Sequence, residues 1–205
     1  VGAIVLAAGA SSRMGQPKVL LPWEDGRTII EHILEQLVRA RVDPIVVVTG
    51  HHADAVRPLA ERYDVRIAHN RSYRNGEMLS SLKAGLRAMP SQVSAALIVL
   101  GDQPRIQPRV VFQLLQAYAM NQGEIIAPSF EHRRGHPILI DRKYWKEFID
   151  LPRTGAPRDV INTYKEKIAY VEVETDSVLR DIDTPSDYEA ERQRAGLRKV
   201  DLDSL

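Results

Sequence analysis

The chain contains no cysteine and carries almost no net charge. Without cysteine it has no disulfides, zinc–thiolate sites, iron–sulfur clusters or thiol nucleophiles. A formal net charge of +1 argues against a general nucleic-acid or membrane-surface binder, which would show a strong basic excess. No apolar run reaches the roughly 18 residues of a membrane span. Residues 1–8 are apolar but lack the basic start and cleavage site of a signal peptide, so we expect a cytoplasmic protein.

What the chain does contain is enough apolar sequence for one sizeable core. It has 205 residues, of which 44% are hydrophobic and 27% charged, as in ordinary globular proteins. We predict a single domain over residues 1–195, followed by a charged tail over residues 196–205. Residues 123–153 interrupt the otherwise regular pattern and are expected to form a small flap or sub-domain.

Expected strands and helices alternate along the chain. Continuous apolar runs predict strands that are buried on both faces, and apolar residues at helical spacing predict the helices between them. The expected strands cover residues 3–8, 44–49, 65–68, 95–100, 124–127, 137–140 and 169–173, and the expected helices cover residues 28–40, 53–63, 77–89, 109–120, 157–167 and 185–194. This order predicts an α/β fold with a doubly wound, mainly parallel sheet and right-handed crossovers.

The first strand runs into a loop of small residues that ends in two cations, Arg13 and Lys18. Small residues let backbone N–H groups approach a phosphate closely, and the two side chains add full positive charges. The spacing is not that of a Walker A loop, since five residues separate Gly9 from Gly15, and no Gly-x-Gly-x-x-Gly follows the strand. The loop predicts a phosphate site, and the alternative is an ordinary strand-to-helix turn with solvated charges.

Three aspartates stand where a cation bound to phosphate would need ligands. Asp102 directly follows an expected buried strand, at the same sheet edge as the loop. Mg²⁺ prefers one or two carboxylates together with phosphate oxygens. Asp181 and Asp183 alternate along an extended segment, so either of them can complete a site with Asp102. The alternative is structural, with Asp102 in a turn and Asp183 or Thr184 capping the last helix.

Two further polar segments suggest ligand contacts. Ser80 and Ser81 lie at the start of an expected helix, where they can bond a base or a ribose; the alternative is ordinary capping by Asn75 and burial of Ser81. The segment 133–137 reads Arg-Arg-Gly-His-Pro, and its glycine between arginine and histidine predicts close approach to an anionic ligand. A surface hairpin is the alternative for this second segment.

Five motifs in collinear order resemble the signature of nucleotidyltransferases that act on molybdopterin. They are Leu-Ala-Ala-Gly-x-Ser-x-Arg-Met-Gly-x-x-Lys at 6–18, Gly-Glu-Met-x-Ser-Ser-Leu at 76–82, Leu-Gly-Asp-Gln-Pro at 100–104, Arg-Gly-His-Pro at 134–137 and Asp-Ile-Asp-Thr-Pro-x-Asp at 181–187. Together they are similar to the molybdenum cofactor cytidylyltransferase branch of the molybdopterin guanylyltransferase-like family. The resemblance implies a Rossmann-like sheet with the active site over the carboxyl ends of its strands.

The resemblance also implies roles for particular residues. Lys18, Arg13 and Asp102 are expected to be catalytic, and Asp102 and Asp183 to bind Mg²⁺. The expected nucleotide-binding residues are Leu6, Ala7, Ala8, Gly9, Ser11, Ser12, Arg13, Lys18, Ser80, Ser81, Gly101 and Asp102, and the expected acceptor-binding residues are Gln103, Arg134, Gly135 and His136. Ala8 stands where guanylyltransferases carry glycine, which favours cytosine as the base.

The implied reaction is attack by the phosphate of molybdopterin on the α-phosphorus of CTP, with pyrophosphate as the leaving group. The expected partners are therefore a nucleoside triphosphate and a phosphorylated small molecule, with docking to a molybdoenzyme or its chaperone, and neither nucleic acid nor membrane. Three alternatives stay open. They are a GTP-dependent molybdopterin guanylyltransferase, a cytidylyltransferase for a sugar phosphate or methylerythritol phosphate, and a non-catalytic carrier of the molybdenum cofactor.

Overall fold

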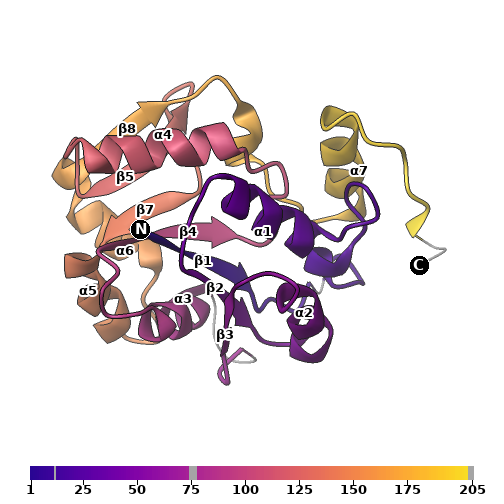
Figure 1. The fold of residues 1–205 in the computed structure, drawn as a ribbon, viewed down its shortest axis with the longest axis horizontal. Helices are drawn as coiled ribbons and strands as arrows, with labels where there is room; N and C mark the ends of the chain where they lie inside the picture. The colour runs from indigo at the N-terminus through magenta and orange to yellow at the C-terminus, as the bar shows by residue number, and fades with distance from the viewer. Residues whose placement is uncertain (12, 74–77, 203–205) are drawn as a thin grey trace.

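An eight-stranded mixed sheet forms the centre of the molecule (Figure 1). The computed structural model describes residues 1–11, 13–73 and 78–202. The strands are β1 (Gly2–Ala7), β2 (Ile45–Thr49), β3 (Arg66–His69), β4 (Ala95–Leu100), β5 (Ile125–Phe130), β6 (Arg133–Arg134), β7 (Ile138–Asp141) and β8 (Ile168–Glu172). Their order is β3-β2-β1-β4-β7-β5-β6, and β8 pairs with β5. Only β7 and β6 run against the others, so the sheet is mainly parallel, as predicted.

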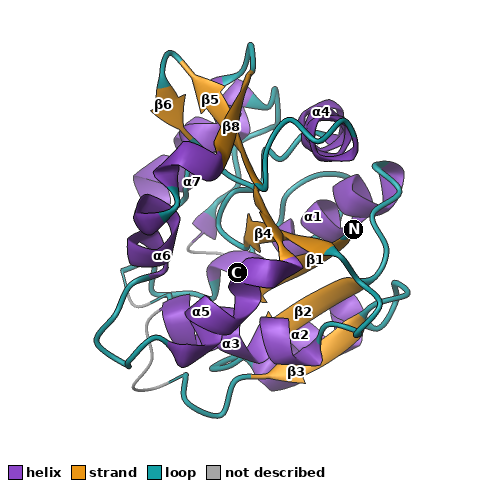
Figure 2. Cartoon of the chain, turned by 90° about the vertical axis from the view of Figure 1, so that its left-hand side faces the viewer, coloured by secondary structure: helices purple, strands orange, loops and turns teal. Residues whose placement is uncertain are grey.

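Helices cover both faces of the sheet (Figure 2). They are α1 (Ile29–Arg39), α2 (Ala53–Ala60), α3 (Met78–Ala88), α4 (Pro108–Ala119), α5 (Trp145–Asp150), α6 (Pro157–Thr163) and α7 (Pro185–Arg194). Buried side chains of α1, α2, α4 and α7 share one core, and those of α3, α5 and α6 share the other. The doubly wound α/β architecture predicted from the sequence is confirmed. No helix in the described part of the chain is long and apolar enough to cross a bilayer.

The central strand β1 shows why these strands are apolar without interruption. Ala3 and Val5 point into the core on the α1 side, whereas Ile4 points into the core on the α3 side, and all three are fully buried. A strand covered on both faces buries every side chain, so hydrophobic and polar residues do not alternate along it. In the sheet, β1 lies between β2 and β4 and pairs with both in parallel.

Two helices begin with reciprocal capping boxes. The Glu31 N–H donates to the Thr28 hydroxyl, and the Thr28 N–H donates to the Glu31 carboxylate. Thr184 and Asp187 form the same arrangement at the start of α7. Because each box satisfies backbone donors that the first turn leaves free, it fixes where the helix starts. The second box therefore fixes the backbone immediately after Asp183.

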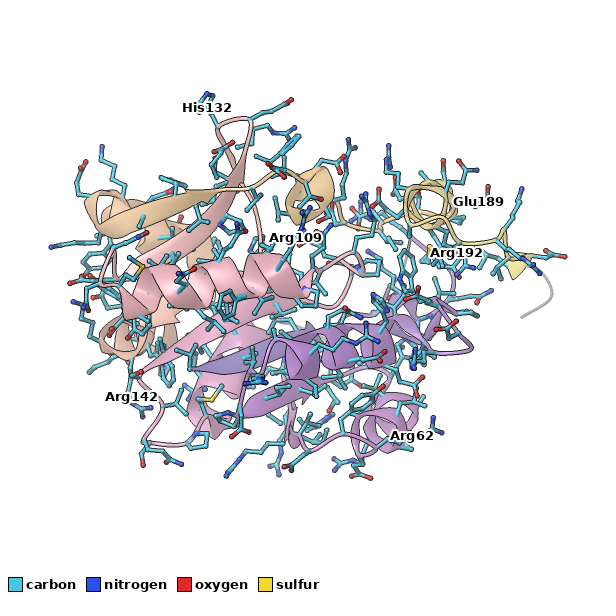
Figure 3. All side chains as sticks on the ribbon, turned by 45° about the horizontal axis from the view of Figure 1, so that its top comes forward. Arg62, Arg109, His132, Arg142, Glu189 and Arg192 are labelled. Atoms are coloured by element: carbon cyan, nitrogen blue, oxygen red, sulfur yellow. The ribbon has the colours of Figure 1, made fainter. Side chains whose placement is uncertain are left out.

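Several boundaries differ from the expected ones. The expected helix over 157–167 ends at Thr163, and a short 3-10 turn over Lys165–Lys167 leads into β8. Residues 123–153 contain β5, β6, β7 and α5; in the central sheet β7 lies next to β4, and β5 lies beyond it, next to β7. The part of this region that projects from the sheet is the β5–β6 hairpin, with His132 at its tip (Figure 3).

Candidate active site

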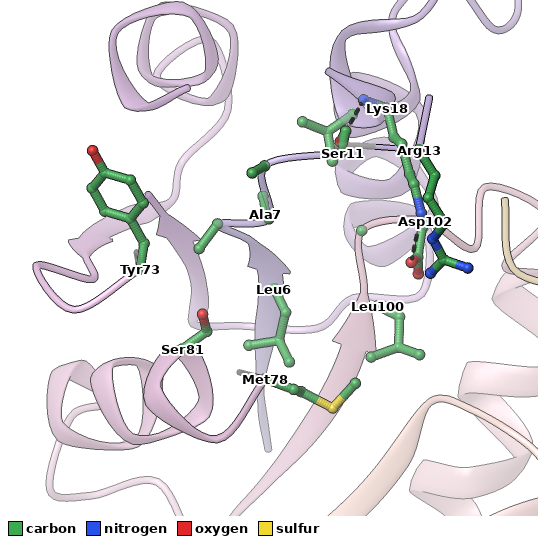
Figure 4. Close-up of a pocket in the computed structure, with 15 residues that line it drawn as sticks. Leu6, Ala7, Ser11, Arg13, Lys18, Tyr73, Met78, Ser81, Leu100 and Asp102 are labelled. Atoms are coloured by element: carbon green, nitrogen blue, oxygen red, sulfur yellow. Dashed lines mark hydrogen bonds and ion pairs between the residues drawn. The ribbon is translucent and has the colours of Figure 1, made fainter. Parts of the chain in front are cut away.

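A cleft of about 350 Å³ opens at the carboxyl ends of β1 and β4 (Figure 4). The chain passes from β1 to β2 on one side, whereas β4 lies on the other side, so the connections diverge here. Open α/β sheets bind ligands at such switch points. Among the residues predicted to bind nucleotide, those that line the cleft are Leu6, Ala7, Ala8, Gly9, Ser11, Arg13, Lys18, Ser81, Gly101 and Asp102.

Lys18 lies between two carboxylates at one end of the cleft. Its Nζ donates to Asp183 Oδ1 at 2.6 Å and lies 3.7 Å from Asp102 Oδ2. Arg13 approaches the other oxygen of Asp183, with its Nη1 2.9 Å from Oδ2. The N-terminal loop, the end of β4 and the segment before α7 therefore converge, and they bring together the two cations and two of the three aspartates that the sequence singled out.

Backbone hydrogen bonds hold these three segments in place. The Lys18 N–H donates to the Ser11 hydroxyl at 3.0 Å, which closes the loop on itself. The Ile182 N–H donates to the carbonyl oxygen of Asp102 at 2.8 Å, so the chain beside Asp183 is bonded directly to the end of β4. Ile182 is fully buried, which anchors this segment between its two exposed or half-exposed aspartate neighbours. The geometry of the cleft is thus set by backbone contacts as well as by ion pairs.

Gly101 has a structural reason to be glycine. Its N–H donates to the Leu6 carbonyl oxygen at 3.1 Å, and a Cβ placed on it would lie only 2.6 Å from that oxygen. Glycine lets the two strand ends approach this closely. The floor of the cleft, between β1 and β4, depends on that approach.

The two carboxylates have opposite pKa shifts. The hydrogen bond from Lys18 and the nearby Arg13 lower the pKa of Asp183. Burial raises the pKa of Asp102, and the negative charges of Asp181 and Asp183 add to the shift, which together outweigh the effect of Lys18. Additional positive charge near Asp102 would therefore favour the charged form of its carboxylate.

The oxygen donors present suit a hard cation that keeps open positions. In the part of the chain that the structure describes, no three or more His, Asp or Glu side chains are grouped to hold a metal ion by themselves. Asp102 and Asp183 supply two carboxylates, and Mg²⁺ is commonly held by one or two carboxylates plus substrate phosphates and water. The donor set therefore fits a metal that arrives with a phosphorylated ligand.

Ser80 and Ser81 face different sides of α3. Ser81 lines the cleft, whereas Ser80 lines a separate groove between α3 and β3. The buried Asn70 side chain bonds both, with its Nδ2 2.8 Å from Ser80 Oγ and 3.1 Å from Ser81 Oγ. Ser12, and residues 76 and 77 of the second motif, lie outside the described residues.

The predicted acceptor-binding residues lie beside the cleft rather than in its described lining. Gln103 and His136 line a separate void of about 10 Å³ that shares Leu100 with the cleft. A Cβ on Gly135 would collide with the Val178 carbonyl oxygen, so its close approach is to its own chain. Arg134 lies half-exposed in β6.

Other residues that line the cleft were not singled out by the sequence as ligand contacts. They are Ala10, Val19, Tyr73, Met78 and Leu100, of which Ala10, Met78 and Leu100 stand within the quoted motifs. Tyr73 lies at the end of the cleft opposite Arg13 and Asp102 (Figure 4). It is brought there by the turn after β3, where Gly50 lies close to both Ala8 and Tyr73.

Comparison with known proteins identifies relatives that share this fold. The family model described as MobA-like NTP transferase domain matches residues 3–168. The molybdenum cofactor cytidylyltransferase of Escherichia coli (strain K12) is 30% identical over 95% of this chain and 96% of its own length. The nicotine blue oxidoreductase of Paenarthrobacter nicotinovorans is 35% identical over 69% of this chain and 71% of its own length.

Solved structures of other proteins also share the fold of this chain. Rv0371c from Mycobacterium tuberculosis H37Rv superposes with a TM-score of 0.80 at 25% identity, covering 94% of this chain and 98% of that one. A nucleotidyl transferase from Methanothermobacter thermautotroptrophicus gives a TM-score of 0.79 at 26% identity, covering 94% and 96%. The family match covers β1 to the start of β8 and includes the loop after β1 and Asp102. The chain therefore belongs to the MobA-like NTP transferase family and is a nucleotidyltransferase by descent.

Proposed function

We propose that this protein transfers CMP from CTP to the phosphate of molybdopterin and releases pyrophosphate. The observation that carries the proposal is the convergence of Asp102, which lines the cleft at the switch point of the sheet, and Asp183 on the Lys18 ammonium group. Support for the base and the acceptor comes from the Escherichia coli relative, a molybdenum cofactor cytidylyltransferase that matches almost the whole chain. Ala8, which lines the cleft, fits the same choice of base.

The reaction needs no nucleophile from the protein, because the attacking phosphate oxygen is already anionic. That oxygen forms a new bond to the α-phosphorus, and the bond from the α-phosphorus to the bridging oxygen breaks, with the electron pair leaving on pyrophosphate. The protein must hold two anions in line and stabilise the charge that builds up. Lys18 and Arg13 supply that stabilisation at the charged end of the cleft, and the small residues around Gly9 let backbone N–H groups contact the phosphates.

Charge balance within the cleft calls for a divalent cation. The positive charges of Lys18 and Arg13 are already matched by the carboxylates of Asp102 and Asp183. A triphosphate brings several further negative charges, which these side chains leave uncompensated. Asp102 and Asp183 would hold Mg²⁺, which when bound neutralises phosphate charge and polarises the α-phosphate. A structure of Rv0371c, 24% identical with a TM-score of 0.76, is a complex with manganese.

The acceptor is placed on the β7 side of the cleft in this proposal. Gln103 and His136 lie next to Leu100, which borders the cleft, and Arg134 adds a half-exposed positive charge on the neighbouring hairpin. Gly135 holds this hairpin against Val178, and so positions Arg134 and His136 together. A face that delivers the finished cofactor to a molybdoenzyme or its chaperone would lie on the same side.

A pyrophosphate-release assay tests the proposal. Purified protein is incubated with CTP, GTP, UTP or ATP, each with molybdopterin, a sugar phosphate or methylerythritol phosphate as acceptor, in Mg²⁺, Mn²⁺ or EDTA. We expect release with CTP and molybdopterin in the presence of a divalent metal and none in EDTA. Faster release with GTP identifies a guanylyltransferase, another acceptor identifies a different substrate, and binding of the cofactor without release identifies a carrier.

The oxidoreductase among the relatives belongs to a different reaction class. Transfer of electrons through a bound dinucleotide commonly uses a Gly-x-Gly-x-x-Gly turn after the first strand, which this chain lacks. The charged end of the cleft suits phosphate transfer, so we propose no redox activity.

A further inference from the structure

A second, larger groove lies on the other side of Asn70 from the cleft. It has a volume of about 670 Å³ and is bordered by β3, the turn after β3, α3 and Arg153. Ser80 faces this groove and Ser81 faces the cleft, while the Asn70 amide bonds both hydroxyls. This bonded trio forms a wall between the two spaces. The groove is therefore distinct from the candidate active site.

The charges that line this groove are all of one sign. Arg71, Lys83, Arg87 and Arg153 border it, and none of the described residues that border it is acidic. The three arginines are exposed and make no ion pair with any described residue, and Lys83 donates to a neutral partner, the Leu151 carbonyl oxygen. The whole chain carries a net charge of only +1, so among the described residues this is a local concentration of positive charge without an acidic partner. Four like charges gathered around one hollow create a positive potential that attracts an anion.

The floor of the groove is apolar, in contrast to its charged border. Leu79, Ala84 and Ala88 from α3 and Ala68 from β3 give it an apolar surface. Hydroxyl groups of Ser72 and Ser80 and the ring of His69 stand among the charges. Sites for small organic ligands combine an apolar surface with a few convergent polar groups, in volumes of roughly 300–1,000 Å³.

We propose that this groove is a second binding site, for a phosphorylated small molecule with a flat or apolar body. Arginine guanidinium groups bind phosphate oxygens in a forked geometry, so Arg71, Arg87 and Arg153 receive the phosphate groups. The body of the ligand lies on the alanines of α3. The site is independent of the transfer reaction in the cleft, and its ligand needs no metal on Asp102 or Asp183.

The test measures anion binding in a protein whose cleft has lost the ammonium group of Lys18. Lys18→Ala protein is titrated by calorimetry at low ionic strength, without divalent metal, using pyrophosphate and CMP as probes. We expect saturable binding in this background, and roughly tenfold weaker binding when Arg87→Glu and Arg153→Glu are added, because each reversal replaces an attraction by a repulsion. The neutral pair Arg87→Gln and Arg153→Gln is expected to give a smaller loss.

A matched control separates the groove from general surface charge. Arg109→Glu, compared with Arg87→Glu alone, makes the same single charge reversal on α4, which covers the opposite face of the sheet from α3 (Figure 3), and should leave binding unchanged. The mutated arginines are exposed and make no ion pair within the described part of the chain, so thermal melts of the variants should match the parent. Tighter binding of CMP than of pyrophosphate identifies a nucleotide-like ligand, and the reverse identifies a simple oligophosphate.

Two results would overturn the proposal. One is the absence of saturable binding of both probes to the Lys18→Ala protein. The other is an equal loss of binding in the Arg109→Glu control and in the groove variants. Neither measurement depends on turnover. The groove can therefore prove not to bind anions while the proposed transfer reaction is confirmed, and the groove can bind anions while the transfer reaction is refuted.

Discussion

At the residue scale, Lys18 is the group on which the proposed chemistry depends most. Its side chain is only 12% exposed, and its ammonium group contacts both candidate metal-binding carboxylates. We expect Lys18→Ala to lower the single-turnover rate of pyrophosphate release by about 10²–10³-fold, as loss of one positioned electrostatic donor does. Lys165→Ala, at an exposed lysine remote in sequence from the cleft, is the matched control. A loss below about threefold in folded protein would remove Lys18 from the mechanism.

Gly9 permits a test that separates folding from ligand binding. A Cβ on this residue meets nothing within 4 Å, so Gly9→Ala should keep or slightly raise the free energy of unfolding. The added methyl group would project where a phosphate chain must approach the backbone, so we expect roughly tenfold weaker CTP binding. Calorimetry and urea unfolding on the same samples check both halves. Unchanged affinity would show that the triphosphate does not lie against this loop.

His136 should respond to acid in a defined way. Burial, with a contribution from Arg134, lowers the pKa of its imidazole from 6.5 to about 4. The unfolded chain therefore binds more protons than the folded chain between those values, so the free energy of unfolding should rise with pH across this window. In His136→Gln protein that part of the slope should disappear. An NMR titration of the ring that gave a midpoint near 6.5 would contradict the lowered pKa.

At the element scale, one arginine ties the end of β4 to the C-terminal part of the chain. Arg105 Nη1 lies 3.1 Å from Glu191 Oε2 on α7 and 3.5 Å from Asp176 Oδ1 in the short helix Asp176–Leu179. These two partners flank the segment that carries Asp183, and Glu191 is buried. Arg105 is thus a positioning residue, which holds one candidate metal-binding loop against the other.

Removal of this tie should be costly for both stability and turnover. We expect Arg105→Met to lower the free energy of unfolding by about 1–3 kcal/mol, because it leaves Glu191 partly unpaired in the interior. It should also lower kcat more than it raises KM for CTP. Arg180→Met removes an exposed partner of the same Asp176 and should cost less than about 1 kcal/mol. Equal kinetic effects of the two substitutions would refute the positioning role.

The helices and strands show which features of secondary structure the hydrophobic pattern predicts. The bounds of β4 and α7 match the expected ranges, because a bounded apolar run and a Thr-Pro start are strong local patterns. Strand direction was not accessible in this way, because a buried apolar run reads the same in a parallel and in an antiparallel strand, and β7 runs against its neighbours. The short helix α5 went unpredicted, because a six-residue helix is too short to show a period.

Some residues of the candidate site could be predicted from the sequence, and others could not. The sequence placed Lys18 and Asp102 at one sheet edge, since both follow parallel strands, and the structure brings them together. Tyr73 also lines the cleft, but nothing in its residue type or spacing marks it, because tertiary packing alone brings it there. The ion pair between Arg105 and Glu191 joins residues 86 positions apart, and no local sequence pattern predicts such a pairing.

At the scale of the whole molecule, ligand binding should be visible as stability. At CTP and Mg²⁺ concentrations about 100 times Kd, mass action adds about 2.7 kcal/mol, which for a chain of this size raises Tm by roughly 5–10 °C. Because the side-chain charges in the cleft already cancel, we expect EDTA to abolish most of that shift. Differential scanning fluorimetry with CTP, with and without EDTA, checks it. An equal shift in EDTA would show that the triphosphate binds without a metal.

The bond between Lys18 and Asp183 joins residues 165 positions apart. During synthesis, the loop that carries Lys18 leaves the ribosome long before Asp183 is translated. An unfinished chain thus exposes the loop without its counterpart, and the complete pocket forms only when α7 docks. Assembly of the pocket is therefore a late step, and any chain that terminates before residue 183 should be inactive even if its first four strands have paired.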